Sequence, residues 1–525
     1  MRVHAKMLVG LGMVLGLAIL LAFIHHWRLR AAVAAAVADF KARGEPMELA
    51  QVLPPPVPPD QNAASSITNA LSNIYVESVL TNFMILNPPA SMDRAIPGKT
   101  MIGWRQPVIH DPEGDWPNTT NTWDELGRQL NARQGDLSDF RKLVGKTTVD
   151  FGYDYSYPKK FAPELALRLP EMKVAAVLLA ASEYYNLHRD NSHEACTDVR
   201  ACLALLRTQT DDRFEITHLA RFALAQGICA RGTWDILQTT NASEDDLARL
   251  QDDWAALKLV GPLKESFLFE RVSSLQEQEK LRHSSTNFQM EVSWTEGAVL
   301  MREYSDSAPS GMFAAFNKVS AGVSLKIHEL HWRWFRSYQD EILGLQLWQT
   351  LIEGTQMMTT NHSFPTLQAY ATNRFNLLGF DSIKDIPYYF ISQNADAQLN
   401  SIRKAAQAET VRNIVMTAIA LKRYEMRHQQ LPETLEKLVP EFLTTVPVDW
   451  MDGQPLRYRR NADGTFLLYS VGENGKDDGG NPELQTDAGT RFSRYDWQHR
   501  AALDWVWPQL AAPEEVQDYF KLHPK

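Results

Sequence analysis

An unbroken run of apolar residues and glycine, Met7 to Ile24, constrains the fold of this chain more than any other feature. As a helix that rises about 1.5 Å per residue, the run would reach ~27 Å, close to the hydrocarbon thickness of a bilayer. The alternative is a cleaved signal peptide, but the next residues, 25–30, are not the small residues of a cleavage site. We therefore expect an uncleaved single-pass anchor. Basic residues flank the run on both sides, so charge does not decide its orientation.

Composition narrows the class of protein. The chain has 525 residues, 44% of them hydrophobic, which predicts two or three folded domains. A net charge of -10 and the lack of a basic block argue against a nucleic acid partner. Cys196, Cys202 and Cys229 are too few for a disulfide framework and form no CxxC pair, so we expect buried thiols. One disulfide between neighbouring helices remains open if the domain lies outside the cytoplasm.

Sequence patterns after the anchor predict a mainly α protein. Residues 29–43 favour a helix, and the proline-rich stretch Pro54–Pro59 favours an extended spacer. Helical periodicity of the apolar residues then indicates a helical body, followed by a small α+β module. We expect the following units: 1–30, cytoplasmic tip and transmembrane anchor; 31–61, juxtamembrane helix and spacer; 62–400, helical body; 401–500, α+β module; 501–525, helical tail.

The middle of the body contains the clearest helical pattern. Residues 171–187 and 194–206 predict one helical hairpin, and residues 213–237 and 243–257 predict a second. These pairs resemble tetratricopeptide-type hairpins but have no strict 34-residue repeat. Two interpretations stay open here: a concave surface for a protein partner, and a plain helical bundle.

Motifs that would indicate catalysis are incomplete. The Val144–Thr148 stretch lacks the glycine that a phosphate-binding loop needs, since Phe140 stands in its place. His328 and His331 lack the spacing of a zinc-protease helix, and no GxSxG elbow occurs. We assign no catalytic or cofactor-binding residue and favour a non-enzymatic role. A cluster of aromatic side chains is expected to fill the core: Trp332, Trp334, Phe335, Tyr338 and Trp348.

A strand near the C-terminus leads into a specialised loop. Residues 455–460 and 465–471 predict an antiparallel hairpin, and the second strand runs into a turn rich in glycine. Asn474, Asp477 and Asp478 in that turn offer oxygen ligands of the kind that calcium prefers. An ordinary solvated turn has the same composition. If calcium binds, we expect it to be structural, because the clustered carboxylates repel one another until a cation neutralises them.

The order of motifs in this region resembles the globular part of the major pseudopilin of type II secretion. The motifs that carry the resemblance are Leu431–Leu435, Val446–Asp449, Asp452–Tyr458, Leu468–Gly472, Asn474–Gly479 and Asp496–Trp497. In that family the glycine-rich loop and a later aspartate bind calcium. The resemblance therefore implies a pseudopilin-like module and a calcium site formed by Asn474, Asp477, Asp478, Asp487 and Asp496. The layout of the whole chain resembles that of uncharacterised bacterial membrane-anchored proteins.

These observations lead to two functional hypotheses. The first is a single-pass helical scaffold or interaction protein in a bacterial inner membrane, with its bulk in the periplasm and a structural calcium loop. Its protein partner would bind the helical body. The alternative is a membrane-tethered hydrolase with a site between the helical body and the C-terminal module.

Overall fold

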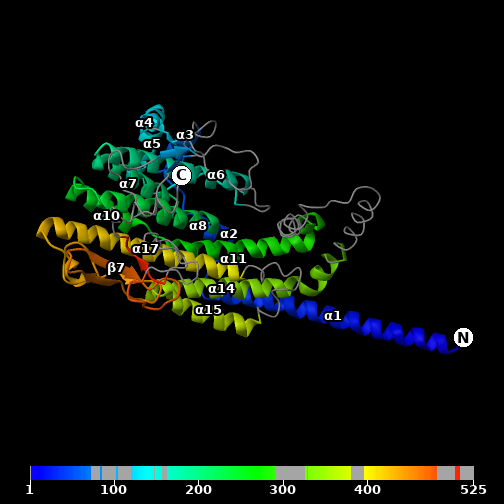
Figure 1. The fold of residues 1–525 in the computed structure, drawn as a ribbon. Coiled ribbons are helices and arrows are strands. Elements are labelled where there is room, and N and C mark those ends of the chain that lie inside the picture. Colours follow the sequence, from blue (N-terminus) through cyan, green and yellow to red (C-terminus); the bar gives the residue numbers. More distant parts are fainter. Residues whose placement is uncertain are drawn as a thin grey trace.

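The computed structural model shows a mainly helical molecule in which long helices pack side by side and one of them projects far beyond the rest (Figure 1). This mainly α architecture confirms the coarse fold prediction. The backbone is described for residues 2–72, 83–85, 102–104, 120–121, 123–146, 148–155, 162–289, 326–327, 329–379, 395–481 and 503–508.

The projecting element is helix α1 (Arg2–Ala42). Within the described part of the chain, it is the helix long and apolar enough to cross a membrane. The helix continues without interruption through the predicted anchor and through the alanine-rich stretch that follows, and it ends before Gly44, whose φ of +77° suits a helix C-terminus. Its last turns are not free: Val33 and Phe40 are buried against Leu345 of helix α14 (Ser337–Asn361).

The proline-rich stretch also lies against the body. It follows the short helix α2 (Leu49–Val52), where the guanidinium of Arg213 donates a 2.7 Å hydrogen bond to the Val52 carbonyl. At its other end the Lys146 ammonium donates to the Asp60 carbonyl, and Asn62 forms a parallel bridge with Thr148. The prediction of a spacer between membrane helix and body needs correction, because both flanks of the prolines are tied to the body.

Of the two predicted helical hairpins, the first is present. The first consists of α6 (Ala162–His188) and α7 (Ser192–Thr208), and the Asn191 side chain caps α7 by accepting from the Glu194 N–H. The helices of the second pair also form, as a long bent helix and α10 (Glu244–Ala256), which Ser243 caps, but α10 packs mainly on α7 and on the later helix α17 (Ala395–His428). The bent helix has three parts: α8 (Glu215–Leu224), the π-helical turn η4 (Ala225–Cys229) and α9 (Ala230–Leu237).

Further helices cover both sides of these hairpins. On one side lie α3 (Ala64–Ser72), α4 (Trp123–Ala132), α5 (Gln134–Arg141) and η3 (Lys142–Gly145). On the other side lie α11 (Val260–His283), η5 (Trp332–Arg336), α14, α15 (Phe364–Leu378) and α17 (Ala395–His428). Three short strands form an antiparallel sheet: β1 (Phe83–Ile85), β2 (Ile102–Trp104) and β3 (Thr120–Asn121).

The C-terminal module packs a small sheet on helix α17 (Figure 1). Before the sheet come the 3₁₀ turn η7 (Leu435–Leu438) and the strand pair β4 (Val448–Asp449) and β5 (Gln454–Pro455). Strands β6 (Arg457–Arg460) and β7 (Phe466–Ser470) form the predicted antiparallel hairpin, with Tyr458 opposite Leu468. One hydrophobic core runs through module and body, so the predicted boundary at residue 400 is no break in the packing.

The predicted helical tail is wrong at its beginning. Trp505 and Val506 form strand β8, which pairs with β7 and extends the hairpin to three strands in the order β6-β7-β8. Trp505, Val506 and Trp507 are all buried. Side chains of this type suit the pleated surface of a half-buried sheet, and the exposed edge of β7 supplies the pairing partner that no local pattern reveals.

Candidate functional site

The predicted metal loop is a tightly hydrogen-bonded turn. Four of its glycines, Gly472, Gly475, Gly479 and Gly480, have positive φ. The carboxylate of Asp504, just before β8, accepts hydrogen bonds from three loop N–H groups: Gly480 at 2.8 Å, Asn481 at 3.0 Å and Asp478 at 3.4 Å. The loop backbone thus wraps around a carboxylate that lies 23 to 26 residues away in the sequence and was not among the predicted site residues.

The predicted ligands inside the loop bond to protein groups. Asp477 accepts hydrogen bonds from the Tyr469 hydroxyl at 2.9 Å and the Gly479 N–H at 3.0 Å, and its carboxylate lies 3.5 Å from the Arg457 guanidinium. The Gly479 N–H is the main reason why the pKa of Asp477 is lowered. Asn474 donates to the Asp478 carboxylate at 3.0 Å.

Two of the predicted ligands, Asp487 and Asp496, lie outside the described residues. Across the part of the chain that is described, no group of three or more His, Cys, Asp or Glu side chains is arranged to hold a metal ion. The structure therefore brings Asn474, Asp477 and Asp478 into one turn, and the calcium site stays a prediction.

Asp449 organises the module beside this loop. Its fully buried carboxylate accepts hydrogen bonds from the Val471 N–H at 2.9 Å and the Met451 N–H at 3.0 Å. The Ser470 hydroxyl donates at 2.9 Å and the Arg457 guanidinium at 3.2 Å. Asp449 thus joins β4 to the end of β7, just before the glycine-rich loop, and is a structural centre of the module.

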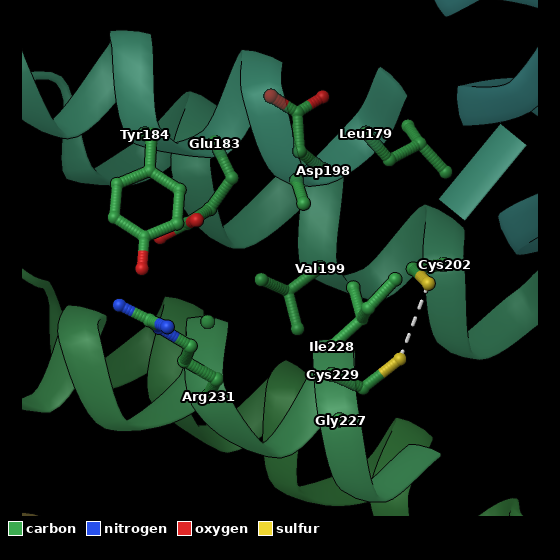
Figure 2. A pocket seen from close by; sticks show the side chains of 12 residues that line it. Leu179, Glu183, Tyr184, Asp198, Val199, Cys202, Gly227, Ile228, Cys229 and Arg231 are labelled. Atoms are coloured by element: carbon green, nitrogen blue, oxygen red, sulfur yellow. Dashed lines mark hydrogen bonds between the residues drawn. The ribbon is translucent and has the colours of Figure 1, made fainter. Parts of the chain in front are cut away.

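A separate small cavity, lined mostly by apolar atoms, lies in the body between α6, α7 and the bent helix η4–α9 (Figure 2). Its volume of about 60 Å³ is room for a small cluster of waters. The π-helical turn η4 contains Gly227, and such turns widen a helix and often occur at functional sites. Gly232 follows on α9, where an added Cβ would come within 2.9 Å of Val199, so a glycine is required for the close approach of α7.

Glu183 is the most unusual side chain of the cavity. It is 1% exposed, and neither carboxyl oxygen has a hydrogen-bond partner in the protein. Burial raises its pKa well above the usual range, and the nearby carboxylates of Asp235 and Asp198 act in the same direction. Burial also raises the pKa of Asp235 to about 7, although the Arg231 guanidinium, with its Nε 4.0 Å from an Asp235 oxygen, opposes this shift.

The chemistry available in the cavity is that of holding water and a proton. Cys202 and Cys229 also line it, but burial raises the pKa of Cys229 well above its usual range, which disfavours the thiolate that a nucleophile requires. The cavity is also not at the place predicted for a hydrolase. At that junction Gln251 donates to the Phe442 carbonyl at 2.6 Å, and Arg423 pairs with Glu244 at 2.7 Å.

The Glu183→Gln variant is expected to gain stability over the natural protein as the pH rises. Folded Glu183 keeps its proton above pH 4.5, where the unfolded side chain releases it, so wild-type stability falls as the pH climbs from 4.5 toward the raised pKa. Glutamine cannot ionise and escapes this loss, which is about 1.4 kcal/mol for each unit of pKa shift. Melting curves at pH 5 and pH 8 measure the difference.

The exposed Glu433→Gln substitution is the matched control, because it removes a carboxylate that water already solvates. We expect it to leave the pH dependence of melting unchanged. A difference between Glu183→Gln and the natural protein that is the same at both pH values would contradict a buried, protonated Glu183.

Comparison with known proteins assigns no function to this site. No family model, no curated protein and no solved structure matches the chain. The likeness to the major pseudopilin consequently rests on sequence motifs alone. The function has to be argued from the anchor, the packing of the body and the geometry of the two sites.

Proposed function

We propose that this protein is a single-pass membrane-anchored scaffold or interaction protein whose helical body lies on the outer side of a bacterial inner membrane. One observation carries the proposal: helix α1, which is long and apolar enough to cross a bilayer, has an apolar run near its beginning and ends as a packed part of the body. The anchor and the body are thus one rigid element rather than two parts joined by a flexible tether.

The attachment of α1 is reinforced by a buried cation. Arg271 of α11 is fully buried and forms an ion pair with Glu45, three residues after the end of α1. The same guanidinium donates to the Pro46 carbonyl at 3.0 Å and to the Gln349 side chain at 2.5 Å, and it lies 4.9 Å from the centre of the Phe40 ring. Removal of one partner of such a buried pair is costly, so these contacts hold the helix end in place.

A rigid connection between the membrane helix and the body is consistent with a scaffold function. A flexible tether lets a domain sample many orientations, whereas a packed helix holds the body at one height and tilt above the bilayer. A binding partner would then be presented at a defined distance from the membrane. We propose that this partner is a protein and that it binds the helical surface between Glu171 and Leu257. The exposed side of α10, with Asp245, Arg249 and Asp252, is part of that surface.

Protease protection tests the location. Spheroplasts and inverted membrane vesicles that contain the full chain are treated with protease, and the body is detected with an antibody. We expect digestion of the body in spheroplasts and protection in inverted vesicles. The control is a variant that lacks residues 2–24, which should no longer sediment with membranes after an alkaline wash. Protection of the body in spheroplasts would refute the proposed orientation.

A structural calcium site in the C-terminal loop is the second part of the proposal. Its support is that Asn474, Asp477 and Asp478 lie in one glycine-rich turn, together with the motif resemblance that adds Asp487 and Asp496. Calcium would neutralise the repulsion among these carboxylates.

Calcium is expected to raise the melting temperature of the detergent-solubilised chain, and a chelator is expected to reverse the shift. Asp478→Ala should abolish the calcium response, whereas Asp463→Ala, in the exposed turn between β6 and β7, should retain it. Asp504→Ala should lower the melting temperature with and without calcium, because it strips three loop N–H groups of their acceptor. A melting temperature that does not respond to calcium would refute the metal site.

A further inference from the structure

Strongly exposed large apolar side chains gather at two places. One group lies on helix α1, and the other lies in the helical residues 326–327 and 329–336, just before α14. The second group comprises Ile327 (61% exposed), Leu330 (45%), Trp334 (51%) and Phe335 (45%). Among the described residues, Ile216 and Leu377 are the other large apolar side chains with comparable exposure. Such a cluster on a folded surface usually marks a site of interaction.

The exposed side chains share one face of the segment. Residues 327, 330 and 334 follow the i, i+3, i+7 spacing of an amphipathic helix, and Phe335 widens the stripe. The opposite face is anchored in the protein by Trp332 and Glu329, which are both fully buried. The prediction that the aromatic side chains of this segment fill the core is wrong for Trp334 and Phe335. Since Trp332 already fills the interior, its neighbours on the other face must point outward.

The stripe lies at the point where α1 leaves the body. His26 of α1 donates a 2.8 Å hydrogen bond from its Nδ1 to the Trp334 carbonyl, and the two rings have their centres 5.4 Å apart. The ring of Tyr338 lies 5.0 Å from the same imidazole. The next residue of α1, Trp27, is 63% exposed. His26 lies two residues beyond the end of the apolar run, which is about 3 Å along a helix. If the run spans the hydrocarbon core, His26 lies at the level of the lipid headgroups.

We propose that Trp27, Ile327, Leu330, Trp334 and Phe335, here named the interface patch, insert into the headgroup region of the bilayer that helix α1 crosses. The inference rests on the proposed anchor. Tryptophan prefers this depth because its ring is amphipathic, and a helix with an apolar face can lie in the interface plane. The bilayer thereby holds the body at a second point.

Site-specific photo-crosslinking tests the patch. The full chain is reconstituted in vesicles of phosphatidylcholine and anionic phosphatidylglycerol, with a photoreactive residue at one position in each sample. We expect lipid adducts at Trp334 and at Phe335, several-fold above those at the control position Ile216, which is exposed and apolar but lies on α8 outside the patch. A label at Leu20, in the exposed apolar part of α1, reports on the anchor itself.

The outcomes separate the two proposals. Lipid adducts at Leu20 without adducts at Trp334 and Phe335 would overturn the patch and leave the anchor intact. A lack of lipid adducts at Leu20 would overturn the anchor. Crosslinks from Trp334 to another protein chain in place of lipid would also overturn the patch. As a second measurement, the Trp334→Ser/Phe335→Ser double variant should lose the lipid adducts at Leu330 several-fold while keeping those at Leu20.

Discussion

Substitution of Asp449 by alanine is expected to lower the free energy of unfolding by about 3–5 kcal/mol, the usual effect of breaking a buried charge pair. The variant leaves the Val471 and Met451 N–H groups without an acceptor in a site that water does not reach. It also removes the Asp449 carboxylate from the Arg457 guanidinium 3.2 Å away. The contacts span β4, β6 and the end of β7, so the whole module should loosen together.

Urea denaturation of the detergent-solubilised chain, followed by the fluorescence of the buried tryptophans in the module, measures this effect. Asp463→Ala is the control, since that aspartate caps an exposed turn and should shift the urea midpoint far less than Asp449→Ala. The stability of Asp449→Asn should lie between those of the two alanine variants. Its amide keeps one acceptor oxygen, but its N–H groups face the donors that bond to the carboxylate. If Asp449→Ala and Asp463→Ala unfold at the same urea concentration, Asp449 does not have the structural role assigned to it.

Protein taken from native membranes is expected to contain a disulfide between Cys202 and Cys229. Their sulfur atoms lie 3.2 Å apart on the neighbouring elements α7 and η4, as free buried thiols in this structure (Figure 2). The proposed periplasmic location is an oxidising one in which disulfides persist. The pairing follows from the tertiary structure, since the sequence offered three cysteines and no preferred partner.

The oxidation is an exchange with a protein disulfide of the compartment. The thiolate of one cysteine attacks that disulfide and releases one thiol of the oxidant, and the second cysteine then displaces the other. Two electrons pass to the oxidant and two protons leave the cysteine pair. Because burial raises the pKa of Cys229 in the folded protein, we expect the exchange to occur before the helices close over the pair.

Alkylation before and after reduction, with mass spectrometry of the peptides, detects the bond. Cys196 is the internal control: it is buried elsewhere on α7 and should be alkylated without reduction once the chain is denatured. Loss of the bond, by reduction or in Cys202→Ala/Cys229→Ala, should lower stability by about 2–4 kcal/mol. Free Cys202 and Cys229 in a chain that protease shows to be periplasmic would contradict this prediction.

Local patterns predicted most of the secondary structure. The apolar run predicted the beginning of α1, the period of apolar residues predicted the pair α6–α7, and alternation with a glycine turn predicted the hairpin β6–β7. These signals are contained in windows of fewer than about 20 residues, and the physical reason is that helix and hairpin contacts are themselves local.

Both sites depend on contacts that no window contains. Asp504 organises a loop more than 20 residues before it, and Asp449 accepts from a strand end 22 residues later. Glu183 became notable only because α7 and α9 bury it without a partner. The side-chain types were visible in the sequence, but the sequence does not show whether a given carboxylate is solvated or buried.

The sequence by itself determined that this is a mainly helical chain with an apolar N-terminal helix and a short hairpin near its end, since backbone geometry and apolar periodicity act over one or two turns. Only the tertiary structure decided that the first helix is packed into the body, that Trp334 and Phe335 face outward, and that β8 completes the sheet. These outcomes depend on which surfaces remain free after distant segments have packed. Apolar surfaces from distant segments compete for burial, so the outcome depends on the packing of the whole molecule.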